Sequence, residues 1–324
     1  MKIVRGLMNV PKMPKGCVLT FGNFDSVHRG HQSIISRVVD VARQQKIPSC
    51  LMIFEPQPEE FFRPDICPAR LTRLKEKLKI FQSWPIDYVI VLHFNQAMAL
   101  LSAQQFLEEI LLKRIHMRYL IVGEDCRFGA NKQGNIDWLQ QVSKQFKFTL
   151  EISQTLEIQP EGHPHFAQHH SRVSSTLVRQ ALAEGDLPLV TQLLGRVYSF
   201  SGRVVHGDKR GRSFGFPTAN IYLHRKKSPL WGVYWVQVGG LDGQVFNGIA
   251  NVGYRPTVKK NDDSFRRILL EVHLFDFNQT IYGQSLQIEF IKKIRNEQRF
   301  ESFELLKKQI QIDIEQVRRL ILTQ

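Results

Sequence analysis

In the first half of the chain, short runs of apolar residues alternate with longer segments in which apolar positions recur every three or four residues. The short runs predict buried strands, and the helical spacing predicts amphipathic helices between them. Strands that alternate with helices are typical of parallel βαβ units in a doubly wound α/β sheet. The predicted strands are residues 18–21, 50–54, 88–93 and 119–122, and the predicted helices are residues 32–45, 69–84, 103–114 and 136–146.

The pattern changes after Gly185 and Asp186. Short strands separated by glycine-rich turns follow, a spacing typical of a small antiparallel barrel or sandwich. A closing segment, 302–323, has apolar residues at helical spacing and predicts a C-terminal helix. We therefore expect two domains, 1–186 and 187–324. The predicted strands of the second domain are residues 198–205, 232–238, 244–252, 268–274 and 285–294.

The composition indicates a globular protein with small anionic partners. The 324 residues are 43% hydrophobic and 23% charged, enough for two ordinary cores. No apolar run approaches the roughly 20 residues that span a bilayer, and the N-terminus lacks the apolar core of a secretory signal, so we expect no membrane partner. Four scattered cysteines predict reduced thiols in the cytoplasm. The net charge of +14 is dispersed and no RNA-binding signature is present, so we expect phosphorylated small molecules and no nucleic acid.

Two histidines stand where the first predicted strand meets the first predicted helix, in "LTFGNFDSVHRGHQSII" (19–35). Ligands bind beyond the carboxyl ends of the strands in such sheets. A helix N-terminus favours an anion, and Gly22 and Gly30 let a phosphate approach the backbone. His28 and His31 add N–H donors, which predicts a phosphate-chain site suited to attack on an α-phosphorus. For an isolated H-x-x-H, a solvated turn or half of a metal site is the alternative.

A second stretch, "SRVSSTLVRQAL" (171–182), offers partners for the same anion. Ser174, Ser175 and Thr176 place hydroxyls at a predicted helix start, and Arg179 would project from the first turn. A plain N-capped helix explains the serines equally well. Paired with the histidine turn, the stretch is interpreted as a clamp for the β- and γ-phosphates.

Longer motifs resemble those of a known family. The histidine stretch resembles the G-x-F-D-x-x-H-x-G-H signature of nucleotidyltransferases related to class I tRNA synthetases, and the lack of a KMSKS-like element argues against a synthetase. "FEPQPEEFF", "RLTRLKEKL", "VGEDCRFGANKQG" and "SSTLVR" follow in the order seen in bacterial FAD synthetases. "GRVVHGDKRGRSFGFPTANI" closely resembles the nucleotide loop of riboflavin kinases, and "GVY", "ANVGYRPT", "EVHLFDF" and "RNEQRF" also fit. The whole chain resembles the bifunctional bacterial FAD synthetase family.

This resemblance implies an α/β doubly wound nucleotidyltransferase domain, then a six-stranded riboflavin kinase barrel with a C-terminal helix. It implies that riboflavin is phosphorylated to FMN and that FMN is adenylylated to FAD, with ATP as co-substrate, Mg²⁺ and release of pyrophosphate. The implied catalytic residues are His28, His31 and Glu271. The implied nucleotide-binding residues are Gly22, Asn23, Phe24, Asp25, His28, His31, Ser174, Ser175, Thr176, Arg179, Gly207, Gly211, Gly215, Pro217, Thr218 and Asn220. The implied flavin-binding residues are Asp125, Arg127, Phe128, Asn251, Arg255 and Arg295.

In the kinase half, the residue types fit the implied roles. Thr218 and Asn220 match family residues that meet the metal and phosphates, and their oxygens are suitable Mg²⁺ ligands. Glu271 matches the general base that accepts a proton from the ribityl hydroxyl. For "EVHLFDF" alone, an outward-facing strand residue would be the better interpretation of Glu271. Arg295 could pair with Glu271 or a phosphate, or be a surface charge.

The chain departs from the family pattern at four positions and leaves one rival function open. Ser26 stands where the family usually has Gly, Gln57 where it has His, and Cys126 and Lys132 where it has Phe and Arg. The rival is a flavin- or nucleotide-sensing binding protein that has lost catalysis. The joint presence of both histidines and the kinase residues argues against it. We also expect "EGHPHFAQHH" (161–170) to be a solvated hairpin loop without a structural metal.

Overall fold

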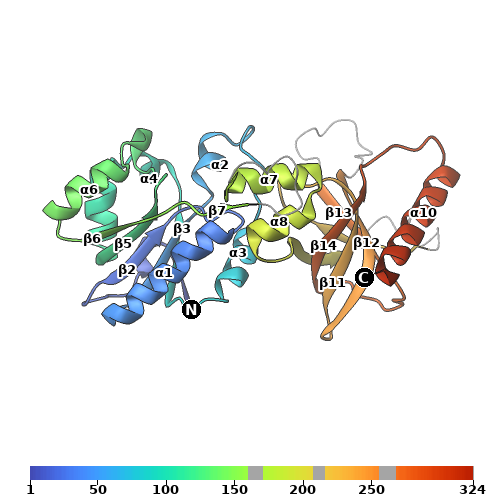
Figure 1. Cartoon of the computed structure of the whole chain (residues 1–324), viewed down its shortest axis with the longest axis horizontal. Coiled ribbons are helices and arrows are strands. Elements are labelled where there is room, and N and C mark those ends of the chain that lie inside the picture. The colour runs from blue at the N-terminus through green and yellow to red at the C-terminus, as the bar shows by residue number, and fades with distance from the viewer. Residues whose placement is uncertain (160–170, 207–215, 255–267, 324) are drawn as a thin grey trace. The chain divides into compact units, whose positions relative to one another are not determined.

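The structure is a computed structural model that describes residues 1–159, 171–206, 216–254 and 268–323 (Figure 1). Its internal contacts divide the chain into two compact units. The first unit is Met1–Pro68 with Thr72–Ser175, and the second is Ala69–Leu71 with Thr176–Gln324. The second unit thus includes three residues from the first half of the sequence. The domain boundary expected at residue 186 stays a prediction.

A six-stranded parallel sheet forms the centre of the first unit, which confirms the predicted parallel sheet, although only four of its strands were predicted. Its strand order is β1-β4-β3-β2-β5-β6. Successive residues of β3 belong to two separate core clusters. Cys50 and Met52 lie in one cluster, and Leu51 and Ile53 lie in the other, so β3 needs apolar residues on both faces of the sheet. The edge strands β1 and β6 lack a continuous buried run and escaped prediction. The strands are β1 (Lys2–Arg5), β2 (Cys17–Phe21), β3 (Ser49–Glu55), β4 (Tyr88–His93), β5 (Met117–Gly123) and β6 (Thr149–Ser153).

Helices connect these strands, and one predicted helix is shorter than expected. Residues 69–84 were predicted to be helical, but α3 begins at Leu74. Arg73 is its N-cap residue, and its backbone N–H donates to Glu76 Oε2 at 2.7 Å, which starts the helix there. The helices are α1 (Arg29–Gln45), α2 (Pro58–Phe62), α3 (Leu74–Phe81), α4 (Gln96–Leu100), α5 (Ala103–Gln105) and α6 (Ile136–Gln145), with the π-helical η2 (Phe106–Leu112), the 3-10 turns η1 (Leu7–Asn9) and η3 (Ala130–Lys132), and a small pair of strands, β7 (Glu157–Ile158) and β8 (Ser171–Arg172).

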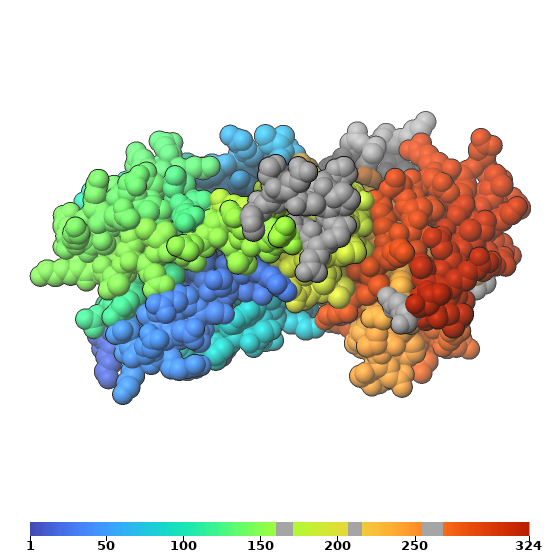
Figure 2. Space-filling model, in the orientation of Figure 1, coloured from blue at the N-terminus to red at the C-terminus, as the bar shows by residue number. Residues whose placement is uncertain are grey.

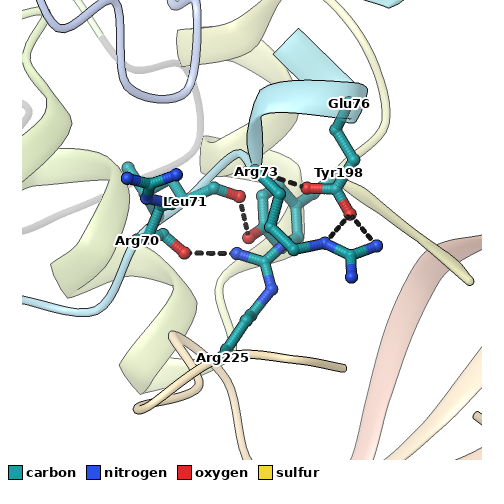
Figure 3. A network of polar contacts seen from close by, with 6 residues as sticks. All are labelled: Arg70, Leu71, Arg73, Glu76, Tyr198 and Arg225. Atoms are coloured by element: carbon teal, nitrogen blue, oxygen red, sulfur yellow. Dashed lines mark hydrogen bonds and ion pairs between the residues drawn. The ribbon is translucent and has the colours of Figure 1, made fainter. Parts of the chain in front are cut away.

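Three of the residues that were wrongly predicted to be helical, 69–71, belong to the second unit and form hydrogen bonds there. The backbone carbonyls of three consecutive residues accept hydrogen bonds from side chains, and two of these bonds are drawn in Figure 3. The pairs are Arg179 Nε to Ala69 O at 2.7 Å, Arg225 Nη1 to Arg70 O, and Tyr198 Oη to Leu71 O at 2.8 Å. A helix would use the same carbonyls for its own backbone bonds, so these contacts favour an irregular segment over a longer α3.

The second unit is a closed six-stranded antiparallel barrel, which confirms the predicted barrel and its C-terminal helix. The strand order is β10-β13-β12-β11-β14-β9. Helix α10, red in Figures 1 and 2, packs Val317 against Val233 and Trp235 of the barrel. The elements are α7 (Ser175–Glu184), α8 (Leu187–Leu194), β9 (Ser199–Val205), β10 (Ala219–Tyr222), β11 (Gly232–Leu241), β12 (Gln244–Tyr254), β13 (Ile268–Leu274), β14 (Ser285–Arg295) and α10 (Phe303–Leu322). Across the described ranges, no helix has both the length and the apolar composition needed to cross a membrane.

Candidate active sites

The turn between β2 and α1, residues 22–28, brings the two histidines together. His28 is the N-cap residue of α1, and its Nδ1 accepts a hydrogen bond from the His31 backbone N–H at 3.2 Å. The two rings stack with centroids 3.7 Å apart and planes 15° apart. Because Nδ1 of His28 is an acceptor, the neutral ring carries its proton on Nε2. The pair therefore lies at the N-terminus of α1, where backbone N–H groups favour an anion.

Both histidines are uncharged at neutral pH. Burial lowers the pKa of His28 to about 4, and the positive charge of Arg172 adds to this effect. Burial also places the pKa of His31 well below its usual value, with smaller contributions from His28 and Lys77. Each ring therefore presents one N–H donor rather than a full charge. Among the described residues, Nδ1 of His31 is buried without a hydrogen-bond partner, which a ligand group or a water would supply.

The turn has an unusual backbone that neighbouring side chains hold in place. Phe24, Ser26 and Val27 have φ of 44°, 68° and 48°, values that L-residues adopt at a cost. Asp25 Oδ1 accepts from the Thr72 backbone N–H at 3.0 Å and from Thr72 Oγ1 at 3.2 Å. The Ser26 backbone N–H donates to Thr72 Oγ1 at 3.1 Å. Ser26 thus occupies a left-handed position that suits glycine, the residue usual in the resembling family.

Ser175 brings the serine stretch into contact with the turn. Ser175 Oγ donates to the Asp25 backbone carbonyl at 2.8 Å, so the predicted proximity of the two motifs holds for this serine. Arg179 directs its Nε–H to the carbonyl of Ala69 at 2.7 Å, a partner that the sequence did not suggest. Phosphate binding by Ser174, Ser175, Thr176 and Arg179 stays a prediction.

The loop with the predicted flavin-binding residues follows β5. Asp125 forms an ion pair with Arg172. The Arg127 Nη1–H donates to the carbonyl of Cys126 at 2.8 Å. Burial raises the pKa of the Cys126 thiol to about 12, so this group is neutral at pH 7. Phe128 packs edge-on or tilted against three aromatic rings of the core, which gives it a structural role besides the predicted one.

In the barrel, strand register aligns three predicted kinase residues. Asn220 of β10 lies opposite Glu271 of β13, and Glu271 lies opposite Asn251 of β12. Directly opposite residues of antiparallel strands project from the same face. The neighbours of Glu271 along β13, Leu270 and Val272, are fully buried, so this row faces outward from the barrel interior. Glu271 is thus an outward-facing residue that nevertheless lies between two other predicted site residues.

His273 is a further residue at this face that sequence reasoning missed. It follows Glu271 by two positions and therefore shares its face of β13. Its Nδ1 lies 2.9 Å from the carbonyl of Pro217. Because a carbonyl can only accept, the His273 Nδ1–H donates this bond and holds the segment before β10. Burial lowers the pKa of His273. From β10, the Asn220 side-chain Nδ2 donates to the Thr218 carbonyl at 3.4 Å, which leaves Asn220 Oδ1 available for another partner.

Arg295 has a partner that was not among the three alternatives. Asp313 is a residue of α10, and its Oδ2 lies 2.9 Å from Arg295 Nε and 2.8 Å from Arg295 Nη2. Gln309 Nε2 also donates to Asp313, at 2.8 Å. Paired charges at separate elements hold the end of β14 to α10. The guanidinium of Arg295 is thus already paired with a carboxylate, and its role in flavin binding stays a prediction.

Some predicted residues lie outside the described residues. They are Gly207, Gly211, Gly215 and Arg255, together with the histidine-rich segment 161–170.

Comparison with known proteins agrees with the division into two units. The FAD synthetase family model matches residues 10–165, and the riboflavin kinase family model matches residues 194–321. The bifunctional riboflavin kinase/FMN adenylyltransferase of Haemophilus influenzae is 44% identical over 97% of both chains, and that of Escherichia coli is 45% identical over 97% of this chain and 96% of its own. A solved structure described as a macrolide-efflux protein from Streptococcus pneumoniae has a TM-score of 0.75 and 26% identity, covering 98% of this chain and 99% of that chain. The chain belongs to the family of bifunctional riboflavin kinases/FMN adenylyltransferases.

Proposed function

We propose that the chain makes FAD from riboflavin in two ATP-dependent steps, each at its own site. The second unit phosphorylates riboflavin to FMN, and the first unit adenylylates FMN to FAD with release of pyrophosphate. The observation that carries this proposal is the near full-length similarity to enzymes named for both activities, together with a histidine turn in one unit and the Asn220–Glu271–Asn251 row in the other.

For adenylyl transfer, the chain needs to bind and orient rather than to react. A phosphate oxygen of FMN attacks the α-phosphorus of ATP, a new P–O bond forms, and the bond to the β-phosphate oxygen breaks as pyrophosphate leaves. Negative charge on the phosphoryl oxygens is stabilised by donors held in place before the reaction. The His28 Nε2–H, the side chain of His31 and the N-terminal N–H groups of α1 are suited to this role.

For the kinase step, Glu271 is the expected proton acceptor. The terminal hydroxyl of the ribityl chain attacks the γ-phosphorus of ATP, its proton passes to the Glu271 carboxylate, and ADP leaves. A positioned carboxylate of this kind typically contributes about 10² to 10⁴ in rate. Asn220 and Asn251, on either side of Glu271, offer amide groups that can orient the substrates around it.

The residues before and in β10 fit a magnesium ion bound with ATP. Asn220 is buried, and its amide nitrogen is turned to the Thr218 carbonyl, so its carbonyl oxygen is free to act as a hard ligand. The Thr218 hydroxyl is the second oxygen expected to hold the ion. When bound there, Mg²⁺ would offset the negative charge of the ATP phosphates.

Small molecules rather than nucleic acids are the proposed partners: the neutral riboflavin and the anions FMN, FAD and ATP. The net charge of +14 supports anionic ligands, since positive fields raise their local concentration. The four cysteines are free thiols, three of them buried, which supports a reducing compartment and hence the cytoplasm.

Turnover of riboflavin tests the proposed function. Purified protein is incubated with riboflavin and Mg-ATP, and the flavins are separated by chromatography. We expect FMN to appear first and FAD to follow, with one pyrophosphate per FAD. Flavin binding without either product would support the rival, a sensing protein, and would contradict the proposal.

A further inference from the structure

The turn of the adenylyl-transfer site rests on α3, a helix to which no role has been given. Every residue from Asn23 to Ser26 contacts α3 or the residues just before it. Thr72 binds Asp25 and Ser26, the ring of Phe81 lies 6.1 Å from that of Phe24, and Lys77 binds Asn23. Because this turn contains three left-handed non-glycine residues, it needs such external support to persist.

Lys77 is the most unusual of these contacts. Its side chain is fully buried, a rare state for a lysine. Its Nζ donates a hydrogen bond to the backbone carbonyl of Asn23, two residues after β2 ends. Its positive charge also acts on His31, whose protonation it opposes. One side chain thus fixes the first part of the turn and acts electrostatically on the histidine at its far end.

We propose that Lys77 is a positioning residue for adenylyl transfer: through the Asn23 carbonyl it holds the turn that presents His28 and His31 to the phosphates. The proposal rests on the proposed function of the histidine turn. Lys77 lies beneath the turn and acts through Asn23 and His31, so its effect is on geometry and protonation rather than on the reacting atoms. Displacing a site by about 1 Å can cost on the order of 100-fold in rate, which sets the scale of the expected effect.

The test compares Lys77→Met with the wild type and with Lys75→Met. Met preserves most of the buried volume without the N–H donors or the charge, and Lys75 is an exposed lysine of the same helix. For Lys77→Met we expect kcat for FMN adenylylation to fall at least about tenfold. Riboflavin phosphorylation should stay within about twofold, and Lys75→Met should match the wild type in both steps. Unchanged adenylylation in folded Lys77→Met would overturn the proposal.

A histidine titration provides a readout that a merely structural lysine would not move. The charged groups that act on the pair are Lys77 on His31, and Arg172, Asp125 and Asp25 on His28. Removing the positive charge of Lys77 should raise the pKa of His31 in ¹H–¹³C spectra of histidine-labelled protein, while Lys75→Met leaves it in place. An unmoved His31 signal would contradict the proposed link.

Lys77→Gln covers the case in which Lys77→Met does not fold. Gln keeps an N–H donor without the charge, so it should retain more adenylylation than Lys77→Met. If both variants lose the thermal transition of the first unit, the role of Lys77 is structural and the proposal is wrong. Wild-type protein that makes FMN but no FAD would instead refute the proposed function itself, so the two failures are distinguishable.

Discussion

The two sites are built in different ways. The histidine site comes from one continuous stretch of the chain. His28 caps the N-terminus of α1, and His31 lies in the first turn of that helix. The kinase row is assembled from three strands, because antiparallel register places Asn220, Glu271 and Asn251 side by side. A local site can be recognised from a contiguous motif and depends on backbone conformation. A site formed by the register of several strands depends on the whole barrel. It should therefore tolerate a change in any one turn better than the local site does.

The largest expected effect concerns the row. Glu271→Gln removes the carboxylate but keeps the size of the side chain, so riboflavin phosphorylation should fall about 100-fold or more. Adenylylation of supplied FMN should be unchanged. Rates are measured separately from riboflavin and from FMN. Glu289→Gln, a change on another strand of the same barrel, is the control and should affect neither step. A kinase rate within a few-fold of wild type would rule out Glu271 as the base.

Acid should destabilise the histidine site through His28, whose pKa burial lowers. His28 has a pKa of about 4 in the folded chain, below its usual 6.5, so between these values only the unfolded chain takes up a proton. The free energy of unfolding of the first unit should therefore fall as pH drops from 6.5 to 4, by about 3 kcal/mol from this group. Hydrogen exchange of the β2 amides at several pH values measures it.

His28→Asn is the matched variant for this pH effect. Asn keeps a side-chain oxygen that can cap α1 but does not titrate. The slope of stability against pH should be shallower in this variant, with His31 still contributing in the same direction. An equal slope in wild type and variant would show that His28 is not the group responsible.

Expressing the barrel without the first half of the chain tests whether the Asn220–Glu271–Asn251 row depends on residues far from it in sequence. We expect residues 187–324 alone to phosphorylate riboflavin, since the barrel closes within this fragment. The fragment lacks Leu71, whose carbonyl accepts from the buried Tyr198 hydroxyl (Figure 3), so it should be less stable by about 1–3 kcal/mol. Thermal unfolding of the fragment and the full chain measures this loss. An inactive or insoluble fragment would contradict the boundary at residue 186.

The smallest expected effect tests the strain in the turn. Ser26 has a φ of 68°, which glycine adopts without steric cost. Ser26→Gly should raise the free energy of unfolding of the first unit by up to about 1 kcal/mol. Ser33→Gly, at an exposed position in the second turn of α1, should lower it by about 0.5 kcal/mol, because glycine is a poorer helix former than serine. Equal destabilisation by both changes would argue against strain at Ser26.

Sequence patterns predicted what local residues determine. The strands Tyr88–His93 and Ile268–Leu274 match their predicted bounds, because each is bounded by clear polar or turn residues. The histidine turn was located from its motif, because its residues are contiguous in the sequence. The short strand β10 was missed, since four residues carry too little pattern to distinguish a strand from a loop.

Other features depend on contacts between distant residues, which a pattern does not contain. The helical spacing of residues 69–84 gave no sign that the carbonyls of residues 69–71 would bond to Arg179, Arg225 and Tyr198. Lys77 belongs to the charged stretch "RLTRLKEKL", in which no pattern singles out one lysine as buried, and only the fold buries it. The Arg295–Asp313 pair joins β14 to α10 and required their packing to be known.

The most direct test of two separate sites is His31→Ala assayed twice, once from riboflavin and once from FMN, with the products resolved. Losing one preorganised donor should slow FMN adenylylation about 100-fold or more. FMN should still form from riboflavin at close to the wild-type rate, because Glu271 and its neighbours belong to the barrel. If folded His31→Ala instead loses riboflavin phosphorylation, or loses both steps equally, the assignment of one reaction to each site is wrong.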